Sequence, residues 1–218
     1  MSKKVLFIIT SRSQYDDGTP TGLWLEEASE PYNILTEAGI DVDIVSIEGG
    51  EIPLDPNSTQ NDELNQYANF VEKLKQVPRI ENIDVSQYDA VYLPGGHGTV
   101  FDFAHNQQLA DILADFKEEK KIISSVCHGP SAFVGAKDKQ GNFLVKGVTL
   151  TSFTDNEERT MGLEDKVPFL TQTELENQGA KFVTKDDFTE HIESDAQFIT
   201  GQNPQSSVAI GKAIRDAL

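Results

Sequence analysis

The sequence has 218 residues, of which 36 are Asp or Glu and 18 are Lys or Arg, so its formal net charge is −18. Such an acidic surface repels phosphate backbones and anionic lipids, and no apolar run approaches the roughly 18 residues that a membrane span needs. We therefore expect neither nucleic acid nor a membrane as a partner. The single cysteine forbids an internal disulfide, which is typical of the reducing cytoplasm and leaves one thiol to explain.

Short β-rich segments alternate with helical segments along the chain. The expected strands are Lys4–Thr10, Ile40–Ile47, Tyr88–Leu93, Lys121–Val126, Val148–Phe153 and Phe198–Thr200. The expected helices are Leu23–Ala38, with Ser29 and Pro31 marking its start and Gly39 just past its end, a segment around Leu109–Phe116, and Ser206–Leu218. Residues 53–80 contain another helical stretch, which we interpret as an excursion from the main sheet.

This alternation predicts an α/β fold with a mostly parallel central sheet and helices on both faces. No internal repeat, low-complexity tract or linker interrupts the chain, so we expect one domain over residues 1–218. Acidic residues crowd the segment from Asp155 to Asp195. We interpret that segment as a solvated outer face, the alternative being a site for a cation or a basic partner.

Cys127 stands where an apolar strand is expected to end and a helix to begin, in the segment SSVCHGPSAF. This is the geometry of a nucleophile elbow, and ligands of parallel sheets bind beyond the carboxyl ends of the strands. A thiol at a helix N-terminus is expected to favour the reactive thiolate, and His128 is a neighbouring candidate base. An inert core cysteine is the alternative. The interruption by His, Gly and Pro in succession argues against it.

A second strand is expected to end at the loop PGGHGT, residues 94–99. Gly95 and Gly96 let backbone N–H groups approach a substrate with no side chain in the way. Because the loop lacks both the P-loop lysine and the dinucleotide spacing, we expect it to cradle an oxyanion or a substrate, with Gly95 and His97 as substrate-binding residues. His105 and His191 lie in polar surroundings and are expected to be solvated.

Taken in order, the segments KVLFIIT, LEEASEP, LPGGHGT, SSVCHGPSAF, LTSFTDNEE and TGQNPQS resemble the ThiJ/PfpI superfamily, which is related to class I glutamine amidotransferases. Within it, the chain is most similar to small single-domain chaperone-type members that act as glutathione-independent glyoxalases (glyoxalase III). The resemblance implies a flavodoxin-like three-layer sandwich and a homodimer. Ser125 departs from the amidotransferase pattern, which has a glycine two residues before the nucleophile, and this argues against glutamine hydrolysis.

By this resemblance, Cys127 is the nucleophile and His128 its general base. The main-chain N–H groups of Gly96 and His128 would stabilise an oxyanion. Glu27 would hydrogen-bond the thiol, and since Glu26 is its neighbour in the chain, only one of the two is expected to face the crevice. A carboxylate beside a thiolate is costly in a dry pocket, so we expect Glu27 to be protonated.

The resemblance also implies an acid that orients the imidazole of His128. That role falls on Glu158, with Glu157 and Asp155 as nearby competitors. The scattered histidines and single cysteine give no metal-ligand pattern, so we expect no metal.

The implied reaction needs no cofactor. The thiolate attacks the aldehyde of a small 2-oxoaldehyde, His128 moves a proton between two carbons through an enediol, and the resulting thioester is hydrolysed to a 2-hydroxy acid. Deglycation would use the same site. The alternatives are a cysteine peptidase or amidase of the PfpI type, and a non-enzymatic stress chaperone or redox sensor.

Overall fold

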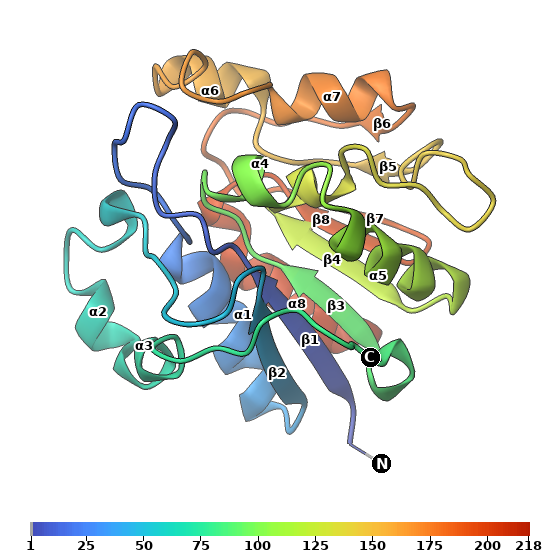
Figure 1. The fold of residues 1–218 in the computed structure, drawn as a ribbon, viewed down its shortest axis with the longest axis horizontal. Helices are drawn as coiled ribbons and strands as arrows, with labels where there is room; N and C mark the ends of the chain where they lie inside the picture. The colour runs from blue at the N-terminus through green and yellow to red at the C-terminus, as the bar shows by residue number, and fades with distance from the viewer. Residues whose placement is uncertain (1) are drawn as a thin grey trace.

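A central β-sheet organises the molecule, and the computed structural model describes residues 2–218 (Figure 1). The strand order is β2-β1-β3-β4-β8-β7. The strands of this sheet are β1 (Lys4–Ile9), β2 (Asp41–Ser46), β3 (Ala90–Leu93), β4 (Ile122–Val126), β7 (Ile192–Asp195) and β8 (Phe198–Gly201). Neighbouring strands are parallel except for the edge strand β7, which runs antiparallel to β8. The predicted α/β fold with a mostly parallel sheet is confirmed.

Helices cover both faces of this sheet. The α-helices are α1 (Leu25–Glu37), α2 (Glu63–Gln66), α3 (Ala68–Lys73), α4 (Thr99–Asp102), α5 (Gln107–Glu118), α6 (Asp155–Thr160), α7 (Thr171–Asn177) and α8 (Ser207–Ala217). Short 3-10 helices are η1 (Pro56–Ser58), η2 (Val85–Gln87), η3 (Gly129–Phe133) and η4 (Pro204–Ser206). None of the helices within residues 2–218 combines the length and the apolar character needed to cross a bilayer.

Alternate residues of β1 serve two separate apolar cores. Leu6 and Ile8 belong to the cluster that α5 covers, whereas Val5 and Phe7 belong to the cluster beneath α1 and α8. All four side chains are fully buried, as expected for a strand covered on both faces. The sheet is therefore the middle of three layers, and α1 packs beside α8 on one side (Figure 1).

The excursion at residues 53–80 holds α2 and α3, which lie outside the sheet (Figure 1). Its apolar side chains, Tyr67 and Phe70 among them, form a third cluster with Leu23, Leu25 and Ala28. The excursion thus packs against the start of α1.

Several predicted boundaries are wrong. Helix α1 begins at Leu25, and Pro31 lies inside it instead of at its start. The segment predicted as a strand from Val148 contributes only β5 (Thr149–Leu150), which pairs with β6 (Lys181–Phe182) in a separate two-stranded sheet. The strand β7 was not predicted, because its sequence IESD has little apolar character.

Candidate active site

Cys127 is held at a strained corner just past β4. Its φ is +58°, in the left-handed region that non-glycine residues seldom adopt. The corner is fixed by two backbone bonds, in which Cys127 N–H donates to the Gly201 carbonyl (2.9 Å) and Phe153 N–H donates to the Cys127 carbonyl (2.8 Å). Gly129 completes it, since a Cβ there would lie 2.2 Å from the Leu93 carbonyl oxygen. These features match a nucleophile elbow.

The PGGHGT loop lies against this corner. The Thr99 hydroxyl is 2.8 Å from the Gly96 carbonyl oxygen and 2.9 Å from the His128 carbonyl oxygen, which ties the two loops together. Within residues 2–218, neither Gly96 N–H nor His128 N–H donates to a protein acceptor. Two donors are therefore available for an oxyanion.

The loop is also pressed against the start of α1. A Cβ on Gly96 would lie 2.1 Å from the Gly22 carbonyl oxygen and 2.6 Å from Trp24 N. A Cβ on Gly95 would lie 2.7 Å from Glu27 Oε2 and 2.8 Å from His128 N. Only glycine fits at either position, so both glycines serve close backbone approach.

Glu27 is fully buried beside the thiol. Its Oε2 accepts a hydrogen bond from Gly95 N–H (2.7 Å), whereas Oε1 is buried without a nitrogen or oxygen partner. Burial raises the pKa of Glu27 to about 8, and its hydrogen bonds with Cys127 and Gly95 offset only part of that effect. The carboxyl group is therefore protonated at neutral pH, as expected. Because Oε2 accepts from Gly95 N–H, Oε1 is the oxygen that can carry the proton.

Only one of the neighbouring pair Glu26 and Glu27 faces the cavity, and it is Glu26, whereas the resemblance favoured Glu27. Glu26 lines the cavity described below, while Glu27 lies behind the cavity wall. Successive residues at the first turn of α1 point about 100° apart, so the two side chains take different directions.

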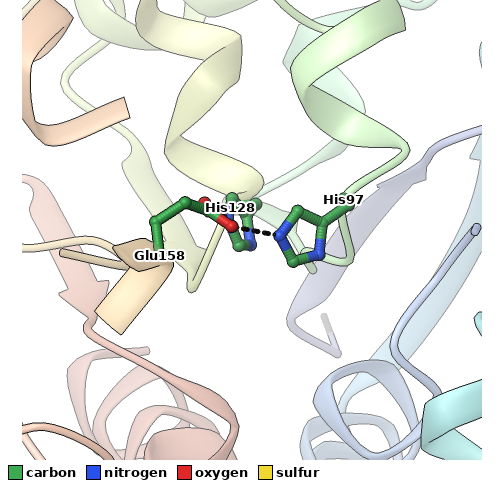
Figure 2. A group of neighbouring side chains, drawn as sticks. All are labelled: His97, His128 and Glu158. Atoms are coloured by element: carbon green, nitrogen blue, oxygen red, sulfur yellow. Dashed lines mark hydrogen bonds and ion pairs between the residues drawn. The ribbon is translucent and has the colours of Figure 1, made fainter. Parts of the chain in front are cut away.

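Glu158 joins two histidines. Its Oε2 lies 2.5 Å from His128 Nε2 and its Oε1 lies 2.5 Å from His97 Nε2 (Figure 2). The other ring nitrogen of His128, Nδ1, is 3.4 Å from Cys127 Sγ. The structure thus aligns a thiol, an imidazole and a carboxylate in the order of a catalytic triad.

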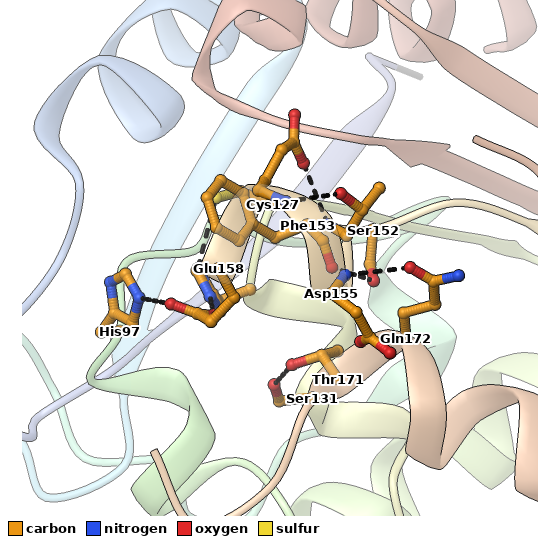
Figure 3. Close-up of polar contacts among 12 residues, drawn as sticks. His97, Cys127, Ser131, Ser152, Phe153, Asp155, Glu158, Thr171 and Gln172 are labelled. Atoms are coloured by element: carbon orange, nitrogen blue, oxygen red, sulfur yellow. Dashed lines mark hydrogen bonds and ion pairs between the residues drawn. The ribbon is translucent and has the colours of Figure 1, made fainter. Parts of the chain in front are cut away.

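The two acids that compete with Glu158 are occupied elsewhere. Glu157 forms the capping box of α6 with Thr154, and its Oε1 accepts from Phe188 N–H and from the amides of Gln202 and Asn203. Asp155 accepts a hydrogen bond from the Thr173 hydroxyl. Figure 3 shows Asp155 beside Gln172, while Glu158 turns to His97.

The resting thiol is neutral. Burial raises the pKa of Cys127 well above its ordinary value, and the negative charges of Glu157 and Glu158 raise it further. This direction is opposite to the one expected for a thiol at a helix N-terminus. The segment after the corner is η3, five residues of 3-10 helix, whose dipole is too short to offset burial.

The pKa values of His128 and Glu158 are both lowered, which favours a neutral imidazole beside an ionised carboxylate. Burial, then the neighbouring His97 ring, lowers the pKa of His128, so the imidazole is neutral. Burial alone would raise the pKa of Glu158, but the two imidazoles hold it well below its usual range. A neutral base next to a fixed carboxylate can accept the thiol proton at the moment of attack, because the imidazolium then formed has its counter-ion in place.

A cavity of about 270 Å³ opens above these groups. Its polar floor is formed by Gly96, His97, Cys127 and His128, and its walls by Trp24, Glu26, Phe153, Met161, Phe188, Pro204 and Gln205. No lysine or arginine lines it in the described part of the chain. A chamber of this kind suits a small neutral molecule and is unfavourable for an anion.

The fold assembles a possible metal-ligand set that the sequence spacing did not reveal. Ligand atoms of His97, His128 and Glu158 lie within 4.8 Å of one another. The two 2.5 Å contacts are the distances of charge-assisted hydrogen bonds, whereas donors around one ion at about 2.0–2.2 Å stand further apart. The arrangement as built is a hydrogen-bonded one.

The other two histidines, His105 and His191, lie in different surroundings. His105 is exposed, as expected, but the expectation for His191 is wrong because its side chain is buried. The chain around His191 folds against Ser206, which bonds both its N–H and its carbonyl group. The link from His97 to Glu158 was also missed. It joins residues 61 positions apart, and no local pattern marks such a pair.

The sheet order, the cysteine corner and the buried carboxyl group beside it define a class of α/β proteins that carry a cysteine at the turn after a central parallel strand. The chain belongs to the DJ-1/PfpI family, whose model matches residues 19–217. It is 31% identical to glutathione-independent glyoxalase HSP31 of Saccharomyces cerevisiae, over 99% of this chain and 98% of that protein.

Three further matches carry informative names. Glyoxalase 3 of Candida albicans is 32% identical over 94% of each chain. The crystal structure of glyoxalase III from Candida albicans superposes with a TM-score of 0.88 at 29% identity, covering 99% of this chain and 97% of that one. Protein/nucleic acid deglycase HchA of Pseudomonas aeruginosa is 26% identical over 96% of this chain and 79% of its own length.

Proposed function

We propose that this protein is a glutathione-independent glyoxalase that converts a small neutral 2-oxoaldehyde, such as methylglyoxal, into a 2-hydroxy acid. The observation that carries the proposal is the position of Cys127 Sγ, 3.4 Å from His128 Nδ1 on the floor of an apolar cavity. The names of the yeast and Candida relatives support the same reaction.

Each polar group has one task in this proposal. His128 takes the thiol proton as Cys127 attacks the aldehyde carbon, and Glu158 stabilises the imidazolium. The N–H groups of Gly96 and His128 stabilise the oxyanion, while Glu27 donates a hydrogen bond to the sulfur. Gly95 and His97 contact the substrate.

Electrostatics supports a neutral substrate. The cavity has no cationic side chain within residues 2–218, and the carboxyl groups of Glu26 and Glu158 lie at or next to it. An anionic 2-oxo acid would be repelled, whereas an uncharged aldehyde would not. We also propose a single domain, a homodimeric assembly and a cytoplasmic location, the last because a lone cysteine suits a reducing compartment.

The test is to incubate the purified protein with methylglyoxal in the absence of glutathione and to measure lactate. Wild type is expected to form lactate, and Cys127→Ala is expected to form none. His105→Gln, which changes an exposed histidine, is the control and should keep full activity. Lactate formation by Cys127→Ala, or amide cleavage without any lactate from wild type, would contradict the proposal.

Deglycation is a second candidate, because HchA carries that name and the same thiol would serve. The cavity accepts a reactive carbonyl compound whether it is free or attached to an amine. The two activities are separated by comparing the rate on methylglyoxal with the rates on a methylglyoxal-treated amino acid and on a methylglyoxal-treated nucleotide. A chaperone that does not use the thiol would suppress aggregation equally well as Cys127→Ala.

A further inference from the structure

The carboxylate of Glu158 fixes the tautomer of two rings at once. An ionised carboxylate only accepts hydrogen bonds, and each of its oxygens lies 2.5 Å from one Nε2 atom, of His97 or of His128. Both Nε2 atoms must therefore carry hydrogen. Each neutral ring is then left with a lone pair on Nδ1.

The Nδ1 atoms of the two rings have different neighbours. Nδ1 of His128 faces the Cys127 thiol at 3.4 Å. Nδ1 of His97 has no hydrogen-bond partner among residues 2–218, and the His97 ring lines the cavity. Figure 2 shows one nitrogen of His97 joined to the carboxylate and the other on the far side of the ring.

Packing keeps the His97 ring in place. The ring centroids of His97 and His128 are 3.9 Å apart, and Tyr15 packs on His97 with a centroid distance of 5.7 Å. The His97 side chain is only 5% exposed, so its Nδ1 cannot exchange the cavity for bulk water by a rotamer change. The His97 ring is thus held at the cavity, beside the ring of His128.

We propose that His97 is a second catalytic residue, which transfers a proton between the two oxygens of the enediol intermediate while His128 transfers the proton between the two carbons. This inference rests on the proposed glyoxalase function and deepens it.

The reaction starts from the hemithioacetal that Cys127 forms with the aldehyde. Its C1 carries hydrogen, hydroxyl and sulfur, and its C2 carries a carbonyl oxygen. His128 removes the C1 proton, the C1–H electrons form the C1=C2 bond, and the C2 carbonyl electrons move onto that oxygen. His97 Nδ1 accepts the C1 hydroxyl proton and delivers it to the C2 oxygen.

The second half reverses the electron flow. The C1 oxygen forms a carbonyl group, and the C1=C2 electrons take the proton from His128 at C2. The product is the thioester of a 2-hydroxy acid, which water cleaves to release the Cys127 thiol. Carbon C1 is oxidised and C2 is reduced, so no outside oxidant or reductant enters.

A single imidazole cannot perform both transfers. After removing the C1 proton, His128 holds that proton on Nδ1, and its other proton is bound to Glu158 through Nε2. His97 alone among the residues on the cavity floor offers a second basic nitrogen in the described structure. Glu158 stabilises whichever ring is protonated, because it contacts both.

The test uses two substitutions that separate proton transfer from positioning. His97→Gln can keep a donor at the position of Nε2, facing Glu158, but has no basic nitrogen. His97→Asn loses the contact with Glu158 as well. Lactate formation from methylglyoxal is measured in deuterium oxide, together with the exchange of the aldehyde hydrogen for deuterium in unreacted substrate. His105→Gln is the control at an exposed histidine.

In His97→Gln, lactate formation is expected to fall about 100-fold. Deuterium exchange and the rate of Cys127 alkylation by iodoacetamide are expected to persist, because His128 still acts. In wild type, lactate formation should be faster than the exchange of deuterium into unreacted substrate. His97→Asn is expected to lose lactate formation at least as strongly.

Wild-type lactate formation by His97→Gln would overturn the proposal. A parallel loss of lactate, exchange and alkylation would also overturn it, because His97 would then act only by holding the site together. Absence of lactate from wild type would instead overturn the proposed glyoxalase function, and the His97 role would fall with it.

Discussion

Glu27 shows how one residue can be tuned by its surroundings. A carboxyl group that is fully buried beside a thiol remains protonated, and burial raises the pKa of Glu27 to about 8. The folded state therefore retains a proton that the unfolded chain has released above its ordinary pKa. The stabilising contribution of this proton is complete below that ordinary pKa and is lost as the pH rises through about 8.

We predict that Glu27→Gln removes this part of the pH dependence. Wild type should lose up to about 1.4 kcal/mol of unfolding free energy per pH unit relative to the variant, between the ordinary pKa of a glutamate and that of Glu27 in the fold. Urea unfolding of both proteins at pH 5, 6.5 and 8 measures it. A wild-type-minus-variant difference that stays constant across these pH values would contradict the protonated state.

At the scale of the element, α1 places Glu27 by means of an irregularity. Pro31 lies inside the helix and has no N–H, so the carbonyl group of Glu27, four residues earlier, receives no helical hydrogen bond. The Tyr92 hydroxyl of β3 donates to that carbonyl oxygen instead, at 2.6 Å. The hydrogen bond from Tyr92 thereby anchors α1 to β3 next to Glu27.

Tyr92→Phe is predicted to destabilise the protein by about 1–3 kcal/mol, because the buried carbonyl group of Glu27 loses its donor. In a Pro31→Ala background, the restored N–H of residue 31 can bond that carbonyl, so the cost of Tyr92→Phe should shrink. Urea unfolding of the four proteins in this cycle measures the coupling. Strict additivity of the two substitutions would show that they act independently.

The same region shows what sequence can and cannot predict. The parallel core strands were predictable because continuous apolar runs such as residues 4–10 leave no other low-energy choice. The Cys127 corner was marked by the adjacent His, Gly and Pro. The internal position of Pro31 was not predictable, because it depends on Tyr92, 61 residues away, as partner of the released carbonyl group. The neutral thiol likewise depends on burial by distant segments.

At the scale of the whole molecule, the excursion at residues 53–80 shares an apolar cluster with the start of α1. That same start of α1 contacts the PGGHGT loop through Gly96. The excursion, α1 and the loop after β3 are therefore joined by one continuous set of packing contacts. This supports the proposal that the chain folds as one domain.

We predict one cooperative unfolding transition. Trp24 is the only tryptophan and lies in the cavity wall, so its fluorescence reports the active site, while far-UV circular dichroism reports all helices and strands. The two urea transitions should coincide. A fluorescence midpoint clearly below the dichroism midpoint would show that the site and its supporting excursion melt independently of the sheet.

The close approach of Gly96 to Gly22 and Trp24 fixes one side of the chamber. On this side, the loops after β3 and β4 and the first turn of α1 are locked together at backbone contact distance, and no larger residue fits at Gly96. Met161, Phe188, Pro204 and Gln205, which also line the chamber, come from the part of the chain after β5. Substitutions at these four residues would therefore reshape the chamber without touching the backbone contacts at Gly96.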